Sequence, residues 1–190
     1  SLDYANRISE DKAAGLEDLF NAIGILQASK APEPKLNVAL SELYEKLATR
    51  KLSLIPKEDK AAAKELELII NYFMFAIDYS PIKEKSLTDI VNSTRQNRSK
   101  ILVRLGEFSE AINELEMVRR NSNPFPELLK YELADAYKWK GFEQYNFGNW
   151  RNAIDDFHKS FQMRPPNEAD KERLAVAYGR LGAESLKGSK

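Results

Sequence analysis

FGNWRNAIDDF, residues 147–157, carries a glycine, an aromatic residue two places later, Ala-Ile three places further on, and a phenylalanine three places after that. Side chains spaced by three and four lie on one face of an α-helix. Trp150, Ala153 and Phe157 are therefore expected to form the buried face of a helix. The small Ala153 marks the place where a second, antiparallel helix can approach closely.

Turn and cap residues flank this expected helix on both sides. Gly148 is expected to end the preceding helix, and Asn149 is placed to cap the new one. Pro165 stops it, and Asn167 with Asp170 is placed to start another helix. A helix pair of this size cannot bury its apolar face alone, so neighbouring pairs must stack.

The same pattern recurs elsewhere in the chain, which indicates internal repeats. Gly106, Phe108, Ala111, Ile112 and Leu115 match Gly148, Trp150, Ala153, Ile154 and Phe157, 42 residues later. Gly182 follows Gly148 by 34 residues, so the longer interval is one 34-residue unit plus eight inserted residues. We expect the insertion at 126–133, as extra turns before a helix.

Proline positions predict where the other helices end, because proline costs about 3 kcal/mol inside a helix. Apolar residues at helical spacing predict amphipathic helices over residues 9–28 and 35–49, joined by the APEP linker. A third helix, largely buried, is expected after Pro56. Ser86–Asp89 resembles a capping box that opens a further helix, which Gly106 can close in a left-handed cap. No stretch alternates with period two for long enough to predict a sheet.

These spacings resemble the tetratricopeptide repeat, a family whose 34-residue unit is a helix-turn-helix. Lys140 and Gln144 depart from the family pattern, which usually has large apolar residues there. The matching residues are Tyr137, Gly141, Gly148, Trp150, Ala153, Ile154, Phe157, Ser160 and Pro165 in one unit, Leu102, Gly106, Phe108, Ala111, Ile112, Leu115 and Val118 in an earlier one, and Leu174, Ala175, Tyr178 and Gly182 in a later one.

The resemblance implies an all-α fold, a right-handed superhelical solenoid of antiparallel helix pairs with about eight helices. Residues 1–91 are expected to form an N-terminal helical region of degenerate repeats or a cap. Residues 92–190 are expected to hold the repeats 92–125 and 134–167, with 168–190 as a partial repeat or capping helix.

Members of this family bind proteins, usually a peptide laid in the concave groove that the first helices of successive repeats form. The resemblance therefore implies a non-enzymatic interaction scaffold. An acidic or C-terminal carboxylate partner with apolar side chains would suit the groove, because Arg and Lys pair with carboxylates and aromatic residues supply contact area. The residues expected to bind this partner are Lys100, Arg104, Lys138, Trp139, Phe142, Tyr145, Asn146 and Arg180.

The basic residues and the aromatic residues of this groove could each have a purely structural role instead of binding a partner. Runs of charge are usually solvated helix faces, and we favour that interpretation for the basic residues from Arg95 to Arg104. The aromatic residues Trp139, Phe142 and Tyr145 fit either partner binding or packing against the inserted turns. Tyr137, Trp150 and Phe157 are expected in the core.

Self-association is the alternative function. Residues 168–185 combine apolar and charged side chains at helical spacing. We favour a capping helix, since terminal repeats need a polar outer face. Docking of this exposed terminal helix onto a second copy would instead make the chain a homo-oligomeric assembly module.

The composition argues against several other classes of protein. The chain has no Cys, which excludes disulfides, thiolate catalysis and Cys-ligated zinc. Its 29 basic and 29 acidic residues balance, which argues against nucleic-acid binding. His158 is the one histidine, and the sequence contains neither a phosphate loop nor a nucleophile elbow. We therefore expect no enzymatic activity, no metal and no cofactor.

The sequence also bears on location. No apolar run approaches the roughly 18 residues of a membrane span, so no span is expected. The segment SLDYANRISEDK is too polar for a signal peptide. A cytoplasmic location is the default expectation, and a periplasmic one would apply if a signal segment had been removed.

Overall fold

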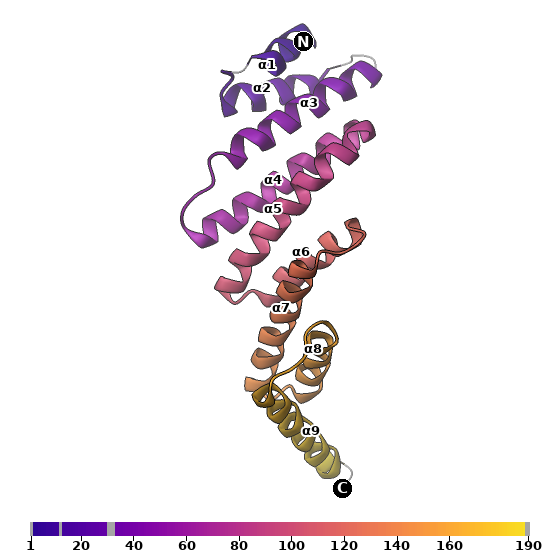
Figure 1. Ribbon diagram of the computed structural model, residues 1–190. Coiled ribbons are helices and arrows are strands. Elements are labelled where there is room, and N and C mark those ends of the chain that lie inside the picture. Colours follow the sequence, from indigo (N-terminus) through magenta and orange to yellow (C-terminus); the bar gives the residue numbers. More distant parts are fainter. Residues whose placement is uncertain (1, 12, 30–32, 189–190) are drawn as a thin grey trace. The chain divides into compact units, whose positions relative to one another are not determined.

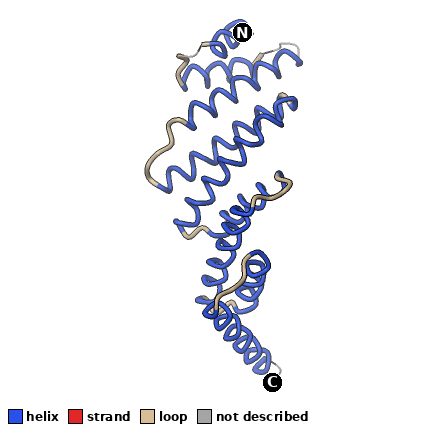
Figure 2. Tube along the Cα trace, in the orientation of Figure 1, coloured by secondary structure: helices blue, strands red, loops and turns tan. Residues whose placement is uncertain are grey.

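The computed structural model describes residues 2–11, 13–29 and 33–188, and within them the chain is helical without any strand (Figures 1 and 2). The all-α prediction is confirmed. The described residues form nine α-helices, against about eight expected, and a short 3-10 helix at Pro81–Lys83. The α-helices are α1 (Leu2–Glu10), α2 (Leu16–Gln27), α3 (Glu33–Leu52), α4 (Asp59–Tyr79), α5 (Glu84–Leu105), α6 (Phe108–Asn121), α7 (Glu127–Asn146), α8 (Trp150–Met163) and α9 (Glu168–Gly188).

The chain divides into two compact units, residues 1–101 and 102–190, and the boundary falls about one turn before the end of α5. We call them unit 1 and unit 2. The expected division at residue 91 concerned repeat signatures rather than compactness, and it stays a prediction.

Unit 1 is built around α3, which contacts α1, α2 and α4 (Figure 1). Its core is one apolar cluster to which helices from α1 to α5 contribute. The Ser41 hydroxyl on α3 donates to the Ala76 carbonyl of α4 at 2.7 Å, so even a buried polar group is paired. The largest fully buried side chains of the cluster are Leu19, Leu26, Leu43, Leu47, Ile69, Phe73, Leu87 and Val91.

The single helix expected over residues 9–28 is instead two helices, α1 and α2. The Asp11 carboxylate accepts from the Ala13 N–H at 2.8 Å, and the Gly15 N–H donates to the Asp18 carboxylate at 3.0 Å. These local bonds satisfy backbone N–H groups without a helix. The chain therefore leaves the helix here, although the spacing of apolar residues predicted a continuous one. The APEP prediction was wrong at Glu33 and Pro34, which lie in the first turn of α3, where proline is tolerated; residues 31 and 32 lie outside the described residues.

The sequence predicted a cap at each end of α5. The capping box at Ser86 was wrong, because α5 begins at Glu84 directly after the 3-10 helix and the Ser86 hydroxyl donates back to the Lys83 carbonyl at 2.9 Å. The cap at Gly106 is confirmed, with φ of 79°. The Glu107 N–H donates to the Leu102 carbonyl at 2.9 Å, which closes the helix.

In unit 2, α7 packs against both α6 and α8, and α8 packs against α9. Gly148 ends α7 with φ of 76°, as predicted. Asn149 precedes α8 but its side chain does not cap that helix, because its amide donates to the Gln144 side chain at 2.9 Å. Asn167 does cap α9, since its side-chain oxygen accepts from the Asp170 N–H at 2.8 Å.

The tightest helix contact in unit 2 joins α7 to α8. A Cβ on Gly141 would lie 2.8 Å from two ring carbons of Phe157, so only glycine fits there without movement. Ala153 and Phe157 are fully buried, as predicted. Tyr137 and Trp150 are partly buried instead. The Trp150 indole N–H donates to Glu184 at 2.9 Å.

Candidate partner-binding face

One face of α7 presents an indole that the core does not cover. Trp139 is 48% exposed, and its ring lies edge-on to Phe142 with 5.5 Å between the centroids. The Phe142 ring contacts the buried Phe157 ring at 5.3 Å, also edge-on. The indole is therefore restrained by a line of rings that reaches the core.

Arg173 on α9 adds a positive charge next to these rings. Its guanidinium carbon lies 4.8 Å from the centroid of the Phe142 ring, within cation–π range. A guanidinium nitrogen is also 3.9 Å from the Asp170 carboxylate. Stacking on one side and an ion pair on the other hold the guanidinium in place, while about half of the side chain stays exposed.

Asp170 is the buried anchor of this arrangement. Its carboxylate lies 3.9 Å from the Lys138 ammonium as well as 3.9 Å from the Arg173 guanidinium. The same ammonium is 3.9 Å from Asp135. Lys138, expected to bind a partner directly, is thus shared between two carboxylates of the protein itself. It orients α7 and α9 more than it offers a free charge.

A second arginine lies on the same side of α7. Arg164, just after α8, donates through one nitrogen to both oxygens of Asp135, at 2.9 and 3.0 Å. Its guanidinium carbon is 5.8 Å from the centroid of the half-exposed Tyr131 ring. Arg164 therefore has the same kind of surroundings as Arg173, because each guanidinium lies over an aromatic ring and beside a carboxylate.

Within unit 2, the structure brings two of the predicted binding residues into contact. Trp139 and Phe142 touch each other, and Lys138 precedes them on the same helix. Tyr145 is turned toward Trp150 instead, with 5.3 Å between the ring centroids. Asn146 and Arg180 are exposed on α7 and α9, and Lys100 and Arg104 are exposed on α5. The whole set stays a prediction. We call the surface formed by Trp139 and Phe142 together with Arg164 and Arg173 the α7 face.

The binding prediction did not include the two arginines of the α7 face. Arg173 carries a signal that could have found it, because it follows Trp139 by 34 residues, one repeat length, and so occupies the same position on the next first helix. Arg164 carries no such signal. Its position depends on Asp135, 29 residues earlier, and only the packing of α7 against α8 brings the two together.

The solvated-face interpretation of the basic run was wrong for Arg98. This side chain is only 7% exposed, and it donates to the Ala63 carbonyl at 3.1 Å and to Glu67 at 3.0 Å. Both partners lie on α4, so Arg98 joins α5 to α4. A guanidinium needs hydrogen bonds when buried, and this one has them.

Unit 1 contains an aromatic cluster that sequence reasoning missed. The nearly buried Tyr44 ring stacks on Tyr79 at 5.8 Å and on Tyr72 at 6.1 Å, and Phe75 lies 5.2 Å away. Burial, and then the neighbouring Tyr79 and Tyr72, raise the pKa of the Tyr44 phenol. The signal lay in α4, where Tyr72, Phe75 and Tyr79 share one helix face at spacings of three and four.

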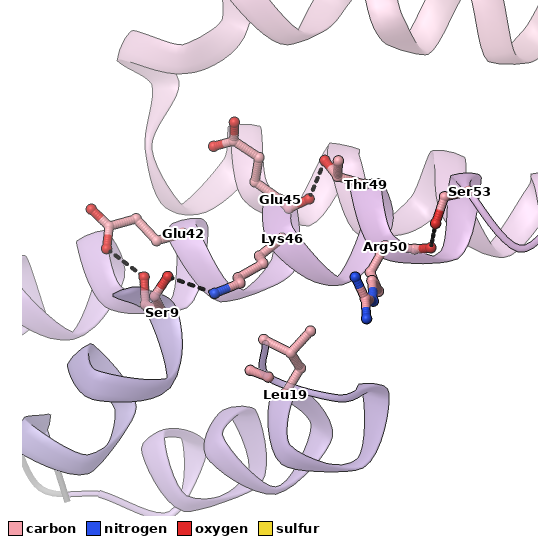
Figure 3. A pocket seen from close by; sticks show the side chains of 9 residues that line it. Ser9, Leu19, Glu42, Glu45, Lys46, Thr49, Arg50 and Ser53 are labelled. Atoms are coloured by element: carbon pink, nitrogen blue, oxygen red, sulfur yellow. Dashed lines mark hydrogen bonds between the residues drawn. The ribbon is translucent and has the colours of Figure 1, made fainter. Parts of the chain in front are cut away.

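A cavity of about 560 Å³ opens between α1, α2 and α3 in unit 1 (Figure 3). Several of its polar groups hold these helices together. The Lys46 ammonium donates to the carbonyls of Ile8, Ser9 and Asp11 at the end of α1, and the Ser9 hydroxyl donates to Glu42 at 3.0 Å. A lysine on the last carbonyls of a helix is a favourable C-terminal cap. The cavity is best explained by structure rather than by ligand binding.

Two further titratable groups, Asp156 and His158, lie on α8. The exposed His158 shares a hydrogen bond of 2.6 Å with the Tyr178 hydroxyl. Asp156 is buried, which raises the pKa of its carboxyl, while Lys140 at 3.8 Å and Lys159 lower it in part. Asp155 is exposed. Among the residues that can be described, no three His, Asp or Glu side chains gather in a way that could hold a metal ion.

No protein-family model matches the chain. The likeness to tetratricopeptide repeats therefore rests on residue spacing alone and stays a prediction. In the part of the chain that the structure covers, no helix combines the length and the apolar character needed to cross a membrane.

Proposed function

We propose that this protein is a non-enzymatic interaction scaffold of the tetratricopeptide type, in which antiparallel helix pairs from about residue 92 onward form a right-handed solenoid. Two local features support the proposal. The glycine turns at Gly106 and Gly148 have the same left-handed geometry, and Gly141 allows the close helix contact that such a unit needs.

The exposed indole of Trp139 carries the functional part of the proposal. A large aromatic side chain that is half exposed, yet restrained by Phe142 beneath it, provides contact area at a low entropic cost. The core does not need it, because Phe142 already covers the Phe157 ring. We propose that the α7 face binds a peptide segment of a partner protein.

The charges on this face favour a particular kind of peptide. Arg164 and Arg173 are each half exposed and held by a carboxylate and a ring. Planar guanidinium groups in fixed orientations suit carboxylates. A peptide with an apolar side chain for Trp139 and an acidic residue nearby would use both features.

A peptide-display selection on the immobilised full chain tests this function. We expect enrichment of peptides that combine acidic and apolar residues, and we expect Trp139→Ala to weaken their binding at least tenfold, about 1.4 kcal/mol. The melting temperature should stay within a degree or two, since the indole is not core. Phe147→Ala removes an aromatic residue that is even more exposed and lies outside the α7 face, and it serves as the control. Selected peptides that bind Trp139→Ala as well as the unaltered chain would contradict the proposal.

A further inference from the structure

The helix α9 has a second apolar side that faces away from α8. Ala175, Gly179, Gly182 and Leu186 follow one another at spacings of four, three and four, so they lie on one side of the helix. All four are exposed, Leu186 by 75%. The fully buried Ala177 lies on the other side and marks the contact with α8. We call these four residues the outer stripe.

The two glycines of the outer stripe are not required by the fold of the chain. A Cβ at Gly179 or Gly182 would meet no atom within 4 Å. Glycine is, after proline, the least favourable residue in a helix interior. Gly141 shows the contrast, because there Phe157 occupies the space that a Cβ would need. Glycines without such a neighbour in their own chain fit a helix that approaches from another molecule.

Larger apolar side chains border the stripe. Tyr178 lies along one edge and Val176 along the other, and each is nearly half exposed. Together with Leu186 they surround the small residues with apolar surface, an arrangement that receives the side chains of a second helix. The feature is therefore an unpartnered apolar face with a narrow centre rather than a row of small residues alone.

Charges indicate which helix fits. Glu172, Val176, Ala183 and Lys187 follow at spacings of four, seven and four, so the two charges share one edge of the stripe at its opposite ends. Both are exposed, and neither forms an ion pair within the described part of the chain. When two identical helices pack antiparallel, the same edge of each helix faces the other. Glu172 of each copy then lies opposite Lys187 of the other copy, which gives two opposite-charge pairs. In a parallel pair the like edges lie on opposite sides of the contact, so Glu172 would face the Tyr178 edge of the second copy and would meet no charge of its own edge.

The register that pairs these charges also suits the small residues. Positions 172 and 187 have their midpoint between Gly179 and Arg180, so the two helices would cross next to a glycine. We propose that two copies of this protein associate through antiparallel packing of their α9 helices on the outer stripe. Arg173 lies on the opposite side of α9, about 200° around the helix from Ala175, so the proposal goes beyond peptide binding and does not use the α7 face.

Because one helix per copy is a small interface, the association should be weak and dependent on concentration. Sedimentation equilibrium of the full chain between about 1 µM and about 0.5 mM tests it. We expect the mass to rise from 21.7 kDa toward twice that value. A mass that stays at 21.7 kDa over the whole range would overturn the proposal.

Two sets of variants locate the interface. Gly179→Ala with Gly182→Ala adds two methyl groups where the helices would cross and should weaken association at least tenfold, although it favours the helix itself. Gly24→Ala, at an open helical site in α2, is the matched control and should leave association unchanged. Association that survives the double glycine change would overturn the proposal.

The charge pairs test the antiparallel arrangement. Glu172→Lys should weaken association several-fold at low salt, and adding Lys187→Glu to the same chain should restore it, because the swapped charges again meet as opposite pairs. In a parallel pair the two charged edges stay apart, so the second change would have no reason to restore association. Failure of the second change to restore association would overturn the antiparallel register.

Discussion

The two units connect their helices in different ways. In unit 2, the turn after α5 and the turn after α7 both use a glycine in the left-handed region, Gly106 and Gly148. In unit 1, each connection that the structure describes is different. Asp11 and Gly15 separate α1 from α2, the Glu58 side chain caps α4, and a 3-10 helix at Pro81–Lys83 leads into α5.

This difference explains why a repeat is visible in one unit and not in the other. A left-handed glycine ends one helix and fixes where the next begins, so the apolar positions that follow keep the same spacing each time. Connections of varied length remove that regularity, even though the helices of unit 1 share one buried apolar cluster. We therefore attribute the missing repeat pattern in the sequence of residues 1–91 to the varied turns rather than to poorer packing.

Unit 1 should depend most on its buried side chains. Phe73 is fully buried in the apolar cluster, so Phe73→Ala is expected to lower the free energy of unfolding by about 3–5 kcal/mol. Phe75→Ala, two residues further along α4, removes a ring that is 44% exposed and should cost about 1 kcal/mol or less. Chemical denaturation followed by circular dichroism measures both. Equal losses would mean that the inward and outward faces of α4 are misassigned.

Unit 2 should be more sensitive in its turns. Gly148→Ala places a side chain at φ of 76°, which costs roughly 1–2 kcal/mol. The cost is conformational, because the new Cβ would lie 3.8 Å or more from its nearest neighbour, Trp150. Gly15→Ala is the control from unit 1, where φ of −75° suits any residue, and it should change stability by about 0.5 kcal/mol or less. A loss at Gly15 as large as that at Gly148 would remove the contrast between the units.

The features that sequence predicted well depend on residues close together in the chain. The turns at Gly106 and Gly148, the cap at Asn167 and the burial of Phe157 each follow from a local spacing. Of the α7 face, Trp139 and Phe142 were predicted to bind a partner because they lie on one side of one helix.

The features that sequence missed depend on distant pairs or on competing local bonds. Arg98 looked like a surface charge until α4 supplied a carbonyl and a carboxylate for it. Arg164 needed Asp135 from another helix. The break between α1 and α2 arose because the carboxylates of Asp11 and Asp18 bind backbone N–H groups that a continuous helix would have used.

The smallest expected effect concerns a buried charge in unit 2. Burial raises the pKa of the Asp156 carboxyl above its ordinary 3.8, and Lys140 at 3.8 Å only partly opposes this. The folded protein therefore holds a proton here that the unfolded chain has already released, so stability falls as the pH rises from about 4 through the folded pKa. At pH 7 the ionised carboxylate is a net cost to the folded state.

Asp156→Asn should accordingly raise the free energy of unfolding at pH 7 by less than about 1 kcal/mol. The gain should shrink as the pH falls through 3.8, because the carboxyl then becomes protonated in the unfolded state as well. Denaturant titrations at pH 3.5 and pH 7 measure the change. Asp155→Asn, on the exposed neighbour, should show no such gain. A loss of stability at pH 7 would mean that the ion pair with Lys140 outweighs burial, and unit 2 would then rely on charge pairing at this point.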